Sequence, residues 1–426
     1  MAKKQFSKES VEAEINLLKS KGSSVIVASK AFGVDDLTEE NQIKNVADEY
    51  NIPVSVASEI SKLYGLTRRT RTAAINASIL PKMLDTATST EKSVRQAGIK
   101  VPLMIMRGDG GVMDISEMKK RPVLTMLSGP AASVVGALMY LRASNGVYFE
   151  VGGTSTNIGV IKNGRPAVDY SIVGGHPTYI NSLDVRVLGI AGGSMIRASK
   201  QGVVDVGPRS AHIAGMPYSV YTDIDEIVDP QVEFFSPKKG DPEDYVAIKL
   251  RNEKRITITN SCAANVLGIV IPEHYSYGNP AAARKAIEPL AKYMNMTVEQ
   301  VAEAILAKSF EKIKPVIEEL AEKYKLEKDQ ISLVGVGGGA AALLPYTASH
   351  MKLEYSIPEN AEVISSIGVA LAMVRDVVER TIPTPSKKDI ADIKKEAAAL
   401  AIANGALPDS VEVQIEIDAQ TSSNVI

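Results

Sequence analysis

The sequence predicts a mixed α/β protein whose sheets are flanked by helices. Three observations lead to this class: apolar strand-like runs alternate with helical segments, several runs end in glycine-rich loops, and some of the following helices consist largely of small residues. Strand–helix–strand alternation is typical of mainly parallel sheets covered by helices. The chain has 426 residues, enough for roughly two or three compact units.

The elements follow one another along the chain in a recognisable order. In the first hundred residues, helical patterns at 10–22 and 35–51 alternate with buried-strand patterns at 23–29 and 52–58. A long helical region follows at 67–98, interrupted or kinked near Pro81. A strand then runs into a glycine turn within 101–113, and Pro130 suits the first turn of a small-residue helix over 127–144.

The second half continues with extended segments and then returns to helices. Extended patterns cover 164–173, 183–197 and 202–208, and helices are predicted at 279–295 and 297–324, the second with a capping-box pattern at its start. Residues 331–351 predict a strand, a glycine loop and a helix. A small-residue helix is expected within 356–380 and a strand-like segment at 411–418.

Composition excludes several classes of partner. The formal net charge is −2, so no overall attraction to nucleic acid or to an anionic membrane surface is expected. No window of the sequence is apolar enough to span a membrane. Cys262 is the one cysteine, which rules out an intrachain disulfide, and the cysteine and histidines lack zinc-site spacing. We therefore expect a cytoplasmic protein that binds neither nucleic acid nor membrane.

The stretch YFEVGGTSTNIGVI (residues 148–161) is the first candidate for chemistry. Backbone N–H groups in such a loop can point at a phosphate because glycine lets the backbone approach closely, and the hydroxyl residues add donors. An acid at the strand end, here Glu150, is suited to holding Mg²⁺ directly or through water. A plain glycine hairpin between antiparallel strands explains the same residues equally well.

A second glycine loop lies nearly 180 residues later, in VGVGGGAAALLP. Gly337, Gly338 and Gly339 separate a buried strand from an alanine-rich helix, a position suited to the α-phosphate or ribose of a nucleotide. A tight strand-to-helix connection is the alternative. The loop lacks the Lys-Ser/Thr ending of a P-loop and the context of a dinucleotide-binding fingerprint, which disfavours both of those classes.

Taken together, these loops resemble those of the actin-like ATPase superfamily, and within it the chain is similar to the hydantoinase A/5-oxoprolinase family with its ketone carboxylase branch. The resemblance extends over nearly the whole chain, with 221–255 fitting worst. It rests on MIMRGDGGVMDISEMKKRPVLTMLSGPAASVVGA, FEVGGTSTNIGVI, LDVRVLGIAGGS, VDVGPRSAHIAGMPY, NPAAARKAIEPLA and VGVGGGAAALLP, which occur in the family order. A sugar-kinase-like phosphotransferase is disfavoured because the segments outside the glycine loops match the hydantoinase family instead.

This resemblance implies actin-like (ribonuclease H-like) lobes and an enzyme subunit that uses ATP and Mg²⁺. Family members open cyclic amides, or activate a ketone before carboxylation, by phosphorylating a carbonyl or enol oxygen, and a second subunit usually completes the reaction. Amide resonance makes direct attack by water slow, and phosphoryl transfer needs positioned donors and a metal. The implied partners are a small cyclic amide or carbonyl substrate and a second hydantoinase-type subunit, and a homo-oligomer is compatible with the sequence.

The resemblance also assigns residues. The second phosphate loop would comprise Gly152, Gly153, Thr154, Ser155 and Thr156, and the adenosine-side loop Gly337, Gly338 and Gly339. Loops bordering the substrate cleft would include Asp109, Gly110, Gly111, Ser128 and Gly129. Glu150, Asn157 and Asp184 are the implied catalytic positions, with Glu150 and Asp184 as metal ligands. Two bland alternatives stay open, with Ser128 as a helix cap and Asp184 as the ion-pair partner of Arg186.

Departures from the family pattern keep a second function open. The family usually has Asp at positions 150 and 157, His at position 186, and GAGGGS where this chain has GIAGGS. Glu150 still reaches a metal through water, Asn157 loses a charge, and Arg186 cannot act as a neutral metal ligand. A non-catalytic or regulatory ATP-binding subunit is therefore the alternative to a cyclic-amide hydrolase or a ketone carboxylase subunit.

The expected domain organisation follows from the resemblance. Residues 1–130 would be the remainder of a first lobe, with parallel α/β segments and a long connecting helix. Residues 131–380 would form the second lobe, including an irregular insertion at about 221–255, and 381–426 would begin a further sheet region. Because relatives carry a first phosphate loop that this sequence lacks, we expect actin-like lobes incomplete at both ends, with a longer polypeptide or a separate chain supplying the rest.

Overall fold

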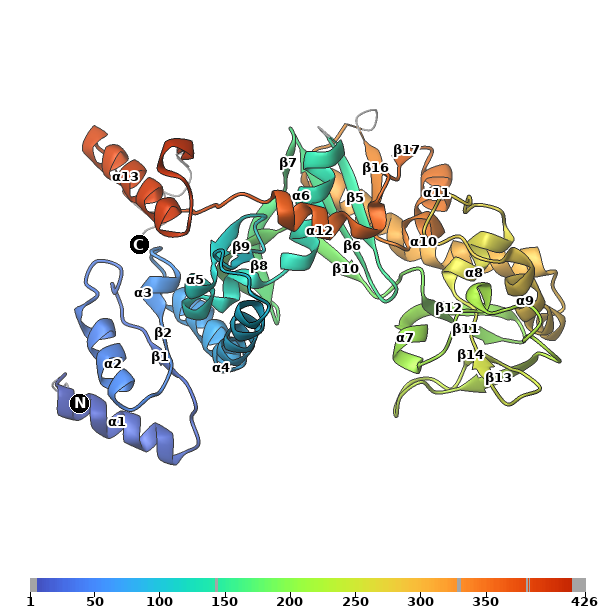
Figure 1. Ribbon diagram of the computed structural model, residues 1–426, viewed down its shortest axis with the longest axis horizontal. Coiled ribbons are helices and arrows are strands. Elements are labelled where there is room, and N and C mark those ends of the chain that lie inside the picture. The colour runs from blue at the N-terminus through green and yellow to red at the C-terminus, as the bar shows by residue number, and fades with distance from the viewer. Residues whose placement is uncertain (1–5, 142–144, 328–330, 381, 383, 416–426) are drawn as a thin grey trace. The chain divides into compact units, whose positions relative to one another are not determined.

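The chain divides into two compact units in the computed structural model. The first comprises 1–131, 168–182 and 372–426, and the second 132–167 and 183–371. The structure describes all residues except 1–5, 142–144, 328–330, 381, 383 and 416–426 (Figure 1).

The first unit begins with a small parallel α/β element. Strands β1 (Ile26–Ala28) and β2 (Val54–Val56) pair in parallel, as predicted, and α1 (Lys8–Ser20) and α2 (Thr38–Glu49) accompany them. Val11, Ile15 and Val46 are buried in the small core that these helices form. Helix α1 starts with the capping box of Ser7 and Ser10, which satisfies otherwise unpaired N–H groups at the helix start.

The long helical region is one helix rather than two. Helix α4 (Leu66–Gln96) continues through Pro81, because buried residues from Arg69 to Ala87 hold it in place. The predicted interruption is wrong, and the kink given as its alternative stays a prediction. The rest of this unit consists of short elements around it: α3 (Ala57–Ile60), the hairpin β3 (Met104–Met106) and β4 (Val112–Asp114), α5 (Ile115–Lys120), η1 (Pro122–Thr125), the paired β8 (Val168–Val173) and β9 (His176–Leu183), α13 (Lys387–Ala403) and η5 (Pro408–Ser410).

The second unit is built on a six-stranded mixed sheet. Its order is β10-β6-β5-β16-β17, with β7 beside β6, and its strands are β5 (Gly146–Val151), β6 (Thr156–Lys162), β7 (Arg165–Pro166), β10 (Val185–Leu188), β16 (Ser332–Val336) and β17 (Glu354–Ser356). Strand β6 runs antiparallel to both β5 and β10, whereas β5, β16 and β17 are parallel. The second of five strands is reversed and the order is 3-2-1-4-5, the ribonuclease H-like topology. The predicted fold class is confirmed.

A second sheet and several helices also belong to this unit. The sheet has the order β12-β11-β14-β13, with β15 beside β14, and α10 packs against β12, α8 and α11. Figure 1 shows α8 and α9 beside this sheet. The elements are β11 (Ser194–Ser199), β12 (Gly202–Ser210), α7 (Ala211–Ala214), η2 (Ser219–Tyr221), β13 (Gln231–Phe235), β14 (Tyr245–Lys249), β15 (Arg255–Ile256), α8 (Asn260–Val266), α9 (Pro280–Met294), α10 (Val298–Lys323), α11 (Ala340–Met351) and η4 (Ala361–Val363). One continuous core joins both sheets to these helices.

Two segments differ from expectation. Residues 221–255, expected to be irregular, supply β13 and β14 to the second sheet; the acids, lysines and prolines that suggested an insertion lie mostly outside these two strands, in the segments before, between and after them. The helix expected within 356–380 spans only α12 (Ile364–Leu371), since Val374 forms a parallel bridge with Val112 and the chain is extended there.

The C-terminal segment also differs from the prediction. Helix α13 was missed; it buries no residues, and therefore shows no strong apolar face in the sequence. The strand-like segment expected at 411–418 has no regular structure over 411–415, and its remainder lies outside the described residues.

Helices α6 (Ser128–Leu141) and α12 meet through glycine. A Cβ at Gly136 would lie 3.0 Å from Cγ1 of Ile364 and 3.2 Å from the backbone nitrogen of Gly368. A Cβ at Gly368 would in turn lie 2.7 Å from the nitrogen of Gly136. Backbone faces backbone at this crossing, so neither helix has room for a side chain at the contact.

We therefore expect Gly136→Ala to lower the free energy of unfolding by about 1–3 kcal/mol, the usual cost of overpacking a tight contact. Urea unfolding followed by circular dichroism measures it. Gly129→Ala is the matched control in the same helix, because no atom lies within 4 Å of a Cβ there; alanine should leave stability unchanged or raise it, since it is the better helix former. Equal stability of the two variants would contradict the close crossing.

Candidate nucleotide site

Three glycine-containing loops meet within the second unit. They follow β5, β10 and β16, and they are joined by backbone hydrogen bonds. The nitrogen of Gly192 donates to the carbonyl of Gly152 at 3.2 Å, and the nitrogen of Gly339 donates to the carbonyl of Val151 at 2.9 Å. Segments almost 190 residues apart along the chain thus form one continuous backbone surface.

No side chain fits where these loops touch. A Cβ at Gly339 would lie 2.7 Å from the carbonyl oxygen of Gly152, and one at Gly192 would lie 3.3 Å from the Cα of Gly339. A Cβ at Gly193 would lie 2.5 Å from the carbonyl oxygen of Gly153. We call Gly152, Gly153, Gly192, Gly193 and Gly339 the glycine floor. A surface of this kind lets a ligand approach the backbone dipoles directly.

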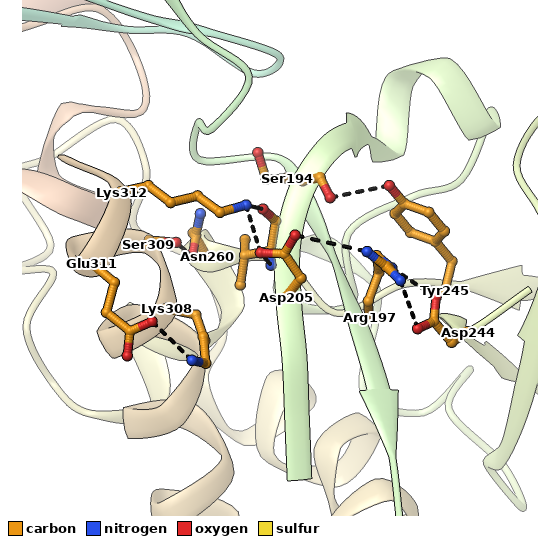
Figure 2. Close-up of polar contacts among 12 residues, drawn as sticks. Ser194, Arg197, Asp205, Asp244, Tyr245, Asn260, Lys308, Ser309, Glu311 and Lys312 are labelled. Atoms are coloured by element: carbon orange, nitrogen blue, oxygen red, sulfur yellow. Dashed lines mark hydrogen bonds and ion pairs between the residues drawn. The ribbon is translucent and has the colours of Figure 1, made fainter. Parts of the chain in front are cut away.

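Polar side chains hold the middle loop of the floor. Asn260, the first residue of α8, donates to the carbonyl of Ala191 at 2.8 Å and accepts from Ser309 of α10, also at 2.8 Å. Both the backbone nitrogen and the hydroxyl of Ser261 donate to the carbonyl of Gly192. Figure 2 shows Asn260 and Ser309 meeting between these helices, with Lys312 reaching Asp205 from the same helix. This buried hydrogen-bond network holds the loop after β10 against helices α8 and α10.

The hydroxyl residues of the first loop divide into two kinds. Thr156 is buried and donates to the carbonyl of Ile190 at 2.5 Å, so its hydroxyl serves the fold. Thr154 is exposed, and its hydroxyl lies 3.0 Å from that of Ser210. The loop is also a hairpin, since β5 and β6 are antiparallel and the nitrogen of Gly152 donates to the carbonyl of Ser155 at 3.1 Å. The hairpin interpretation of this stretch is therefore confirmed, and the phosphate-loop interpretation stays a prediction.

Glu150 is tied to two neutral partners. Its carboxylate accepts from the hydroxyl of Ser133 at 2.5 Å and from the side-chain amide of Asn157, its cross-strand neighbour, at 2.8 Å. A second carboxylate at position 157 would face the first across this short distance and repel it. Asn157 instead donates a hydrogen bond, so the Glu150 carboxylate meets a donor rather than a second acid beside the first loop.

Asp184 is part of an ionic cluster at the end of α10. Arg186 donates to one carboxylate oxygen at 2.6 Å, and Lys323 and Tyr324 donate to the other, each at 2.6 Å. Burial by itself would raise the pKa of Asp184, but the hydrogen bonds from Lys323, Tyr324 and Arg186 outweigh it and hold the pKa below its ordinary value. The alternative interpretation of Asp184, as the partner of Arg186, is confirmed.

Comparison with known proteins decides the family. The family model for hydantoinase/oxoprolinase matches residues 69–378. The chain belongs to the hydantoinase/oxoprolinase family.

Individual relatives agree with this membership. An uncharacterized protein of Methanocaldococcus jannaschii is 22% identical over 412 residues, which is 92% of this chain and 56% of that protein. The acetophenone carboxylase gamma subunit of Aromatoleum aromaticum is 26% identical over 234 residues, 51% of this chain and 31% of that protein. The crystal structure of the ATP-dependent caprolactamase of Pseudomonas jessenii shares the fold, with a TM-score of 0.67 at 20% identity over 94% of this chain and 57% of that chain. This hydantoinase/oxoprolinase-family chain thus spans about half the length of these relatives or less.

The remaining predicted residues of this hydantoinase/oxoprolinase chain belong to the first unit. Asp109 is fully buried, accepts from Arg107 at 2.8 Å and receives the nitrogen of Gly111 at 3.2 Å. Arg107 also pairs with Asp376 at 3.2 Å. Asp109 and Gly111 are therefore part of a buried ionic cluster, and Gly110 forms its turn at a positive φ of 91°.

The other two predicted cleft residues lie at the start of a helix. Ser128 and Gly129 form the first turn of α6, where Gly129 is exposed.

Sequence reasoning missed part of the floor and its neighbours. Gly192 and Gly193 appeared only within a motif that carries the resemblance and departs from it, without a role of their own, and His212 and Tyr218 were not singled out. The available signal was GIAGGS directly after a strand, the same arrangement that identified the other loops.

Within the described ranges, no group of three or more His, Cys, Asp or Glu residues is placed to hold a metal ion. Among those same residues, no helix combines the length and apolar character needed to cross a membrane.

Asp184→Asn should lower the free energy of unfolding at neutral pH by about 1–3 kcal/mol, since several charge-assisted hydrogen bonds are lost. The folded pKa is depressed, so the contribution of the carboxylate is fully present above its unfolded pKa of about 3.9 and is lost as the pH falls through the folded value. The difference between the variant and the parent should thus narrow below about pH 4, as followed by urea titrations across pH.

Asp229→Asn is the matched control, because the Asp229–Arg251 pair is 61% and 69% exposed and should contribute little at any pH. A pH-independent loss in Asp184→Asn would argue against the charged cluster.

Proposed function

We propose that this chain is the ATP-binding portion of an enzyme that opens a cyclic amide by phosphorylating its carbonyl oxygen. The observation that carries the proposal is the glycine floor. Three strand ends deliver backbone to one place, and the loop after β5 presents exposed Gly152 and Thr154. A polyphosphate requires convergent N–H groups and hydroxyls. Because the N–H groups of Gly152, Gly192 and Gly339 hold the loops together, we assign the phosphate contacts to the rest of the loop after β5. Family membership and the fold shared with an ATP-dependent caprolactamase support this choice.

The two ends of the glycine floor suit different parts of a nucleotide. Gly339 is the N-cap of α11, so Gly337, Gly338 and Gly339 suit the adenosine side of a nucleotide, and the loop from Gly152 to Ser155 suits its phosphates. Bound ATP supplies the phosphoryl group that makes the carbonyl oxygen a leaving group. The chain's own contribution is to fix the phosphates and to present fixed dipoles to the charge that develops.

Glu150 fits an Mg²⁺ ion that accompanies the nucleotide, whereas Asp184 does not. The Glu150 carboxylate is half-buried beside the first loop and has only neutral hydrogen-bond partners, so its charge is available to a hydrated cation. Both oxygens of Asp184 accept from Arg186, Lys323 or Tyr324. We therefore place the metal contact at Glu150, assign Asn157 to orienting that carboxylate, and assign Asp184 a structural role.

Nucleotide binding is the first test. Mg·ATP should bind this chain in titration calorimetry, and Gly339→Ala should weaken binding at least about tenfold, because the added methyl group pushes the third loop away from Gly152. Gly136→Ala is the control: it loosens the same unit at the α6–α12 crossing without touching the floor, and should bind as the parent does. Absence of ATP binding to the parent chain would refute the proposal.

Phosphate release identifies the chemistry. With a second hydantoinase-type subunit present, ATP-dependent phosphate release should rise when hydantoins, 5-oxoproline or larger lactams are added, and not when linear amides are added. The match to an acetophenone carboxylase subunit favours one other function, a ketone carboxylase subunit. That activity would show release that depends on both a ketone and bicarbonate. If the chain binds ATP but neither cyclic amides nor ketones stimulate phosphate release, the chain is a regulatory ATP-binding subunit.

A further inference from the structure

Two aromatic side chains stand at one end of the glycine floor. His212 lies in the short helix α7, and Tyr218 follows it after a turn. The Nε2 atom of His212 lies 3.0 Å from the hydroxyl of Tyr218, and the ring centroids are 5.6 Å apart. His212 is exposed and Tyr218 is half-buried, so the pair faces solvent from one side.

The pair contacts the floor directly. A Cβ added at Gly193 would collide with the Tyr218 hydroxyl, and one added at Gly153 would collide with Nε2 of His212 and lie 3.3 Å from the Tyr218 hydroxyl. The polar ends of both side chains therefore occupy the space that side chains at these glycines would take. This contact needs glycine at both positions.

The same contacts show in which order the glycines lie along the floor. Gly339 touches Gly152 and Gly192, whereas Gly153 and Gly193 touch Tyr218. Along the floor, Gly339 is followed by Gly152 and Gly192, and these are followed by Gly153 and Gly193. The aromatic pair lies after Gly153 and Gly193. A nucleotide whose adenosine lies near Gly339 and whose phosphates follow the first loop ends beside His212 and Tyr218.

Tyr218 is held rigidly in this position. The carbonyl of Pro217 accepts from the nitrogen of Thr257, and the nitrogen of Ser219 donates to the carbonyl of Thr257, so the backbone on both sides of Tyr218 is fixed to one residue. The Tyr218 ring also packs on Tyr221 at 5.6 Å. Burial raises the pKa of the Tyr218 hydroxyl, which keeps its proton available for donation at neutral pH.

We propose that His212 and Tyr218 form a donor pair that binds the terminal phosphate of a nucleotide on the glycine floor and so distinguishes a triphosphate from a diphosphate. The inference rests on the proposed nucleotide site. A proton on Nε2 of His212 donates to the Tyr218 oxygen and leaves the tyrosine O–H to donate to a phosphate oxygen.

The test compares Mg·ATP with Mg·ADP in titration calorimetry. The parent chain should prefer ATP, and Tyr218→Phe and His212→Gln should each weaken ATP binding about tenfold or more while leaving ADP binding unchanged, since a hydrogen bond to a charged group is lost only with the terminal phosphate. His176→Gln, an exposed histidine of the first unit, is the matched control and should bind both nucleotides as the parent does.

The outcomes separate the two proposals. Equal weakening of ATP and ADP, or no weakening of either, would overturn the donor pair while the nucleotide site stands. Binding of neither nucleotide to the parent chain would overturn both. Thermal unfolding midpoints without nucleotide should match among parent, Tyr218→Phe and His212→Gln, because neither change removes an apolar contact from the core; a selective ATP loss at equal midpoints supports the donor pair.

Discussion

Backbone-to-backbone contact among three strand ends is the constraint on which the second unit depends. The nitrogens of Gly192 and Gly339 reach carbonyls of the loop after β5, and the Cα atoms are too close for side chains. Such contact requires β5 to lie between β6 and β16 in the sheet and β10 to lie beyond β6. The buried Asn260–Ser309 pair then supports the middle loop from two helices. The contacts between the loops therefore depend on both the order of the strands and the packing of the helices.

The Glu150–Asn157 pair shows how a carboxylate can be held in place by a neutral donor, without a second acid beside it. In the family pattern, positions 150 and 157 both carry a carboxylate, and two adjacent carboxylates repel each other unless a cation or a shared proton compensates them. Here the amide of Asn157 supplies a hydrogen bond at 2.8 Å, and Ser133 supplies another. The substitution at position 157 therefore leaves the Glu150 carboxylate in place beside the loop after β5 and surrounds it with neutral donors.

Much of this arrangement could be predicted from the sequence. Strand–helix alternation predicted sheets flanked by helices, the family resemblance implied the ribonuclease H-like topology, and glycine after a strand identified two of the three loops. The parts that were missed depend on long-range contacts. Gly192 and Gly193 matter because Gly153 and Gly339 lie against them, and His212 matters because a turn brings it over Gly153. The two β-strands within 221–255 were obscured by the charged turn that joins them, and Pro81 suggested a break that tertiary packing overrides. Local pattern does not carry that information.

The interleaving of the two units has a consequence for how the protein is made. The chain passes from one unit to the other four times, at the ends of 1–131, 132–167, 168–182 and 183–371. Domains generally fold as units during synthesis, from the N-terminus onward. Here the second unit is complete once residue 371 has emerged from the ribosome, whereas the first still lacks the segment from 372 that holds Asp376, the ionic partner of Arg107. The part of the chain that begins first is therefore the part that finishes folding last.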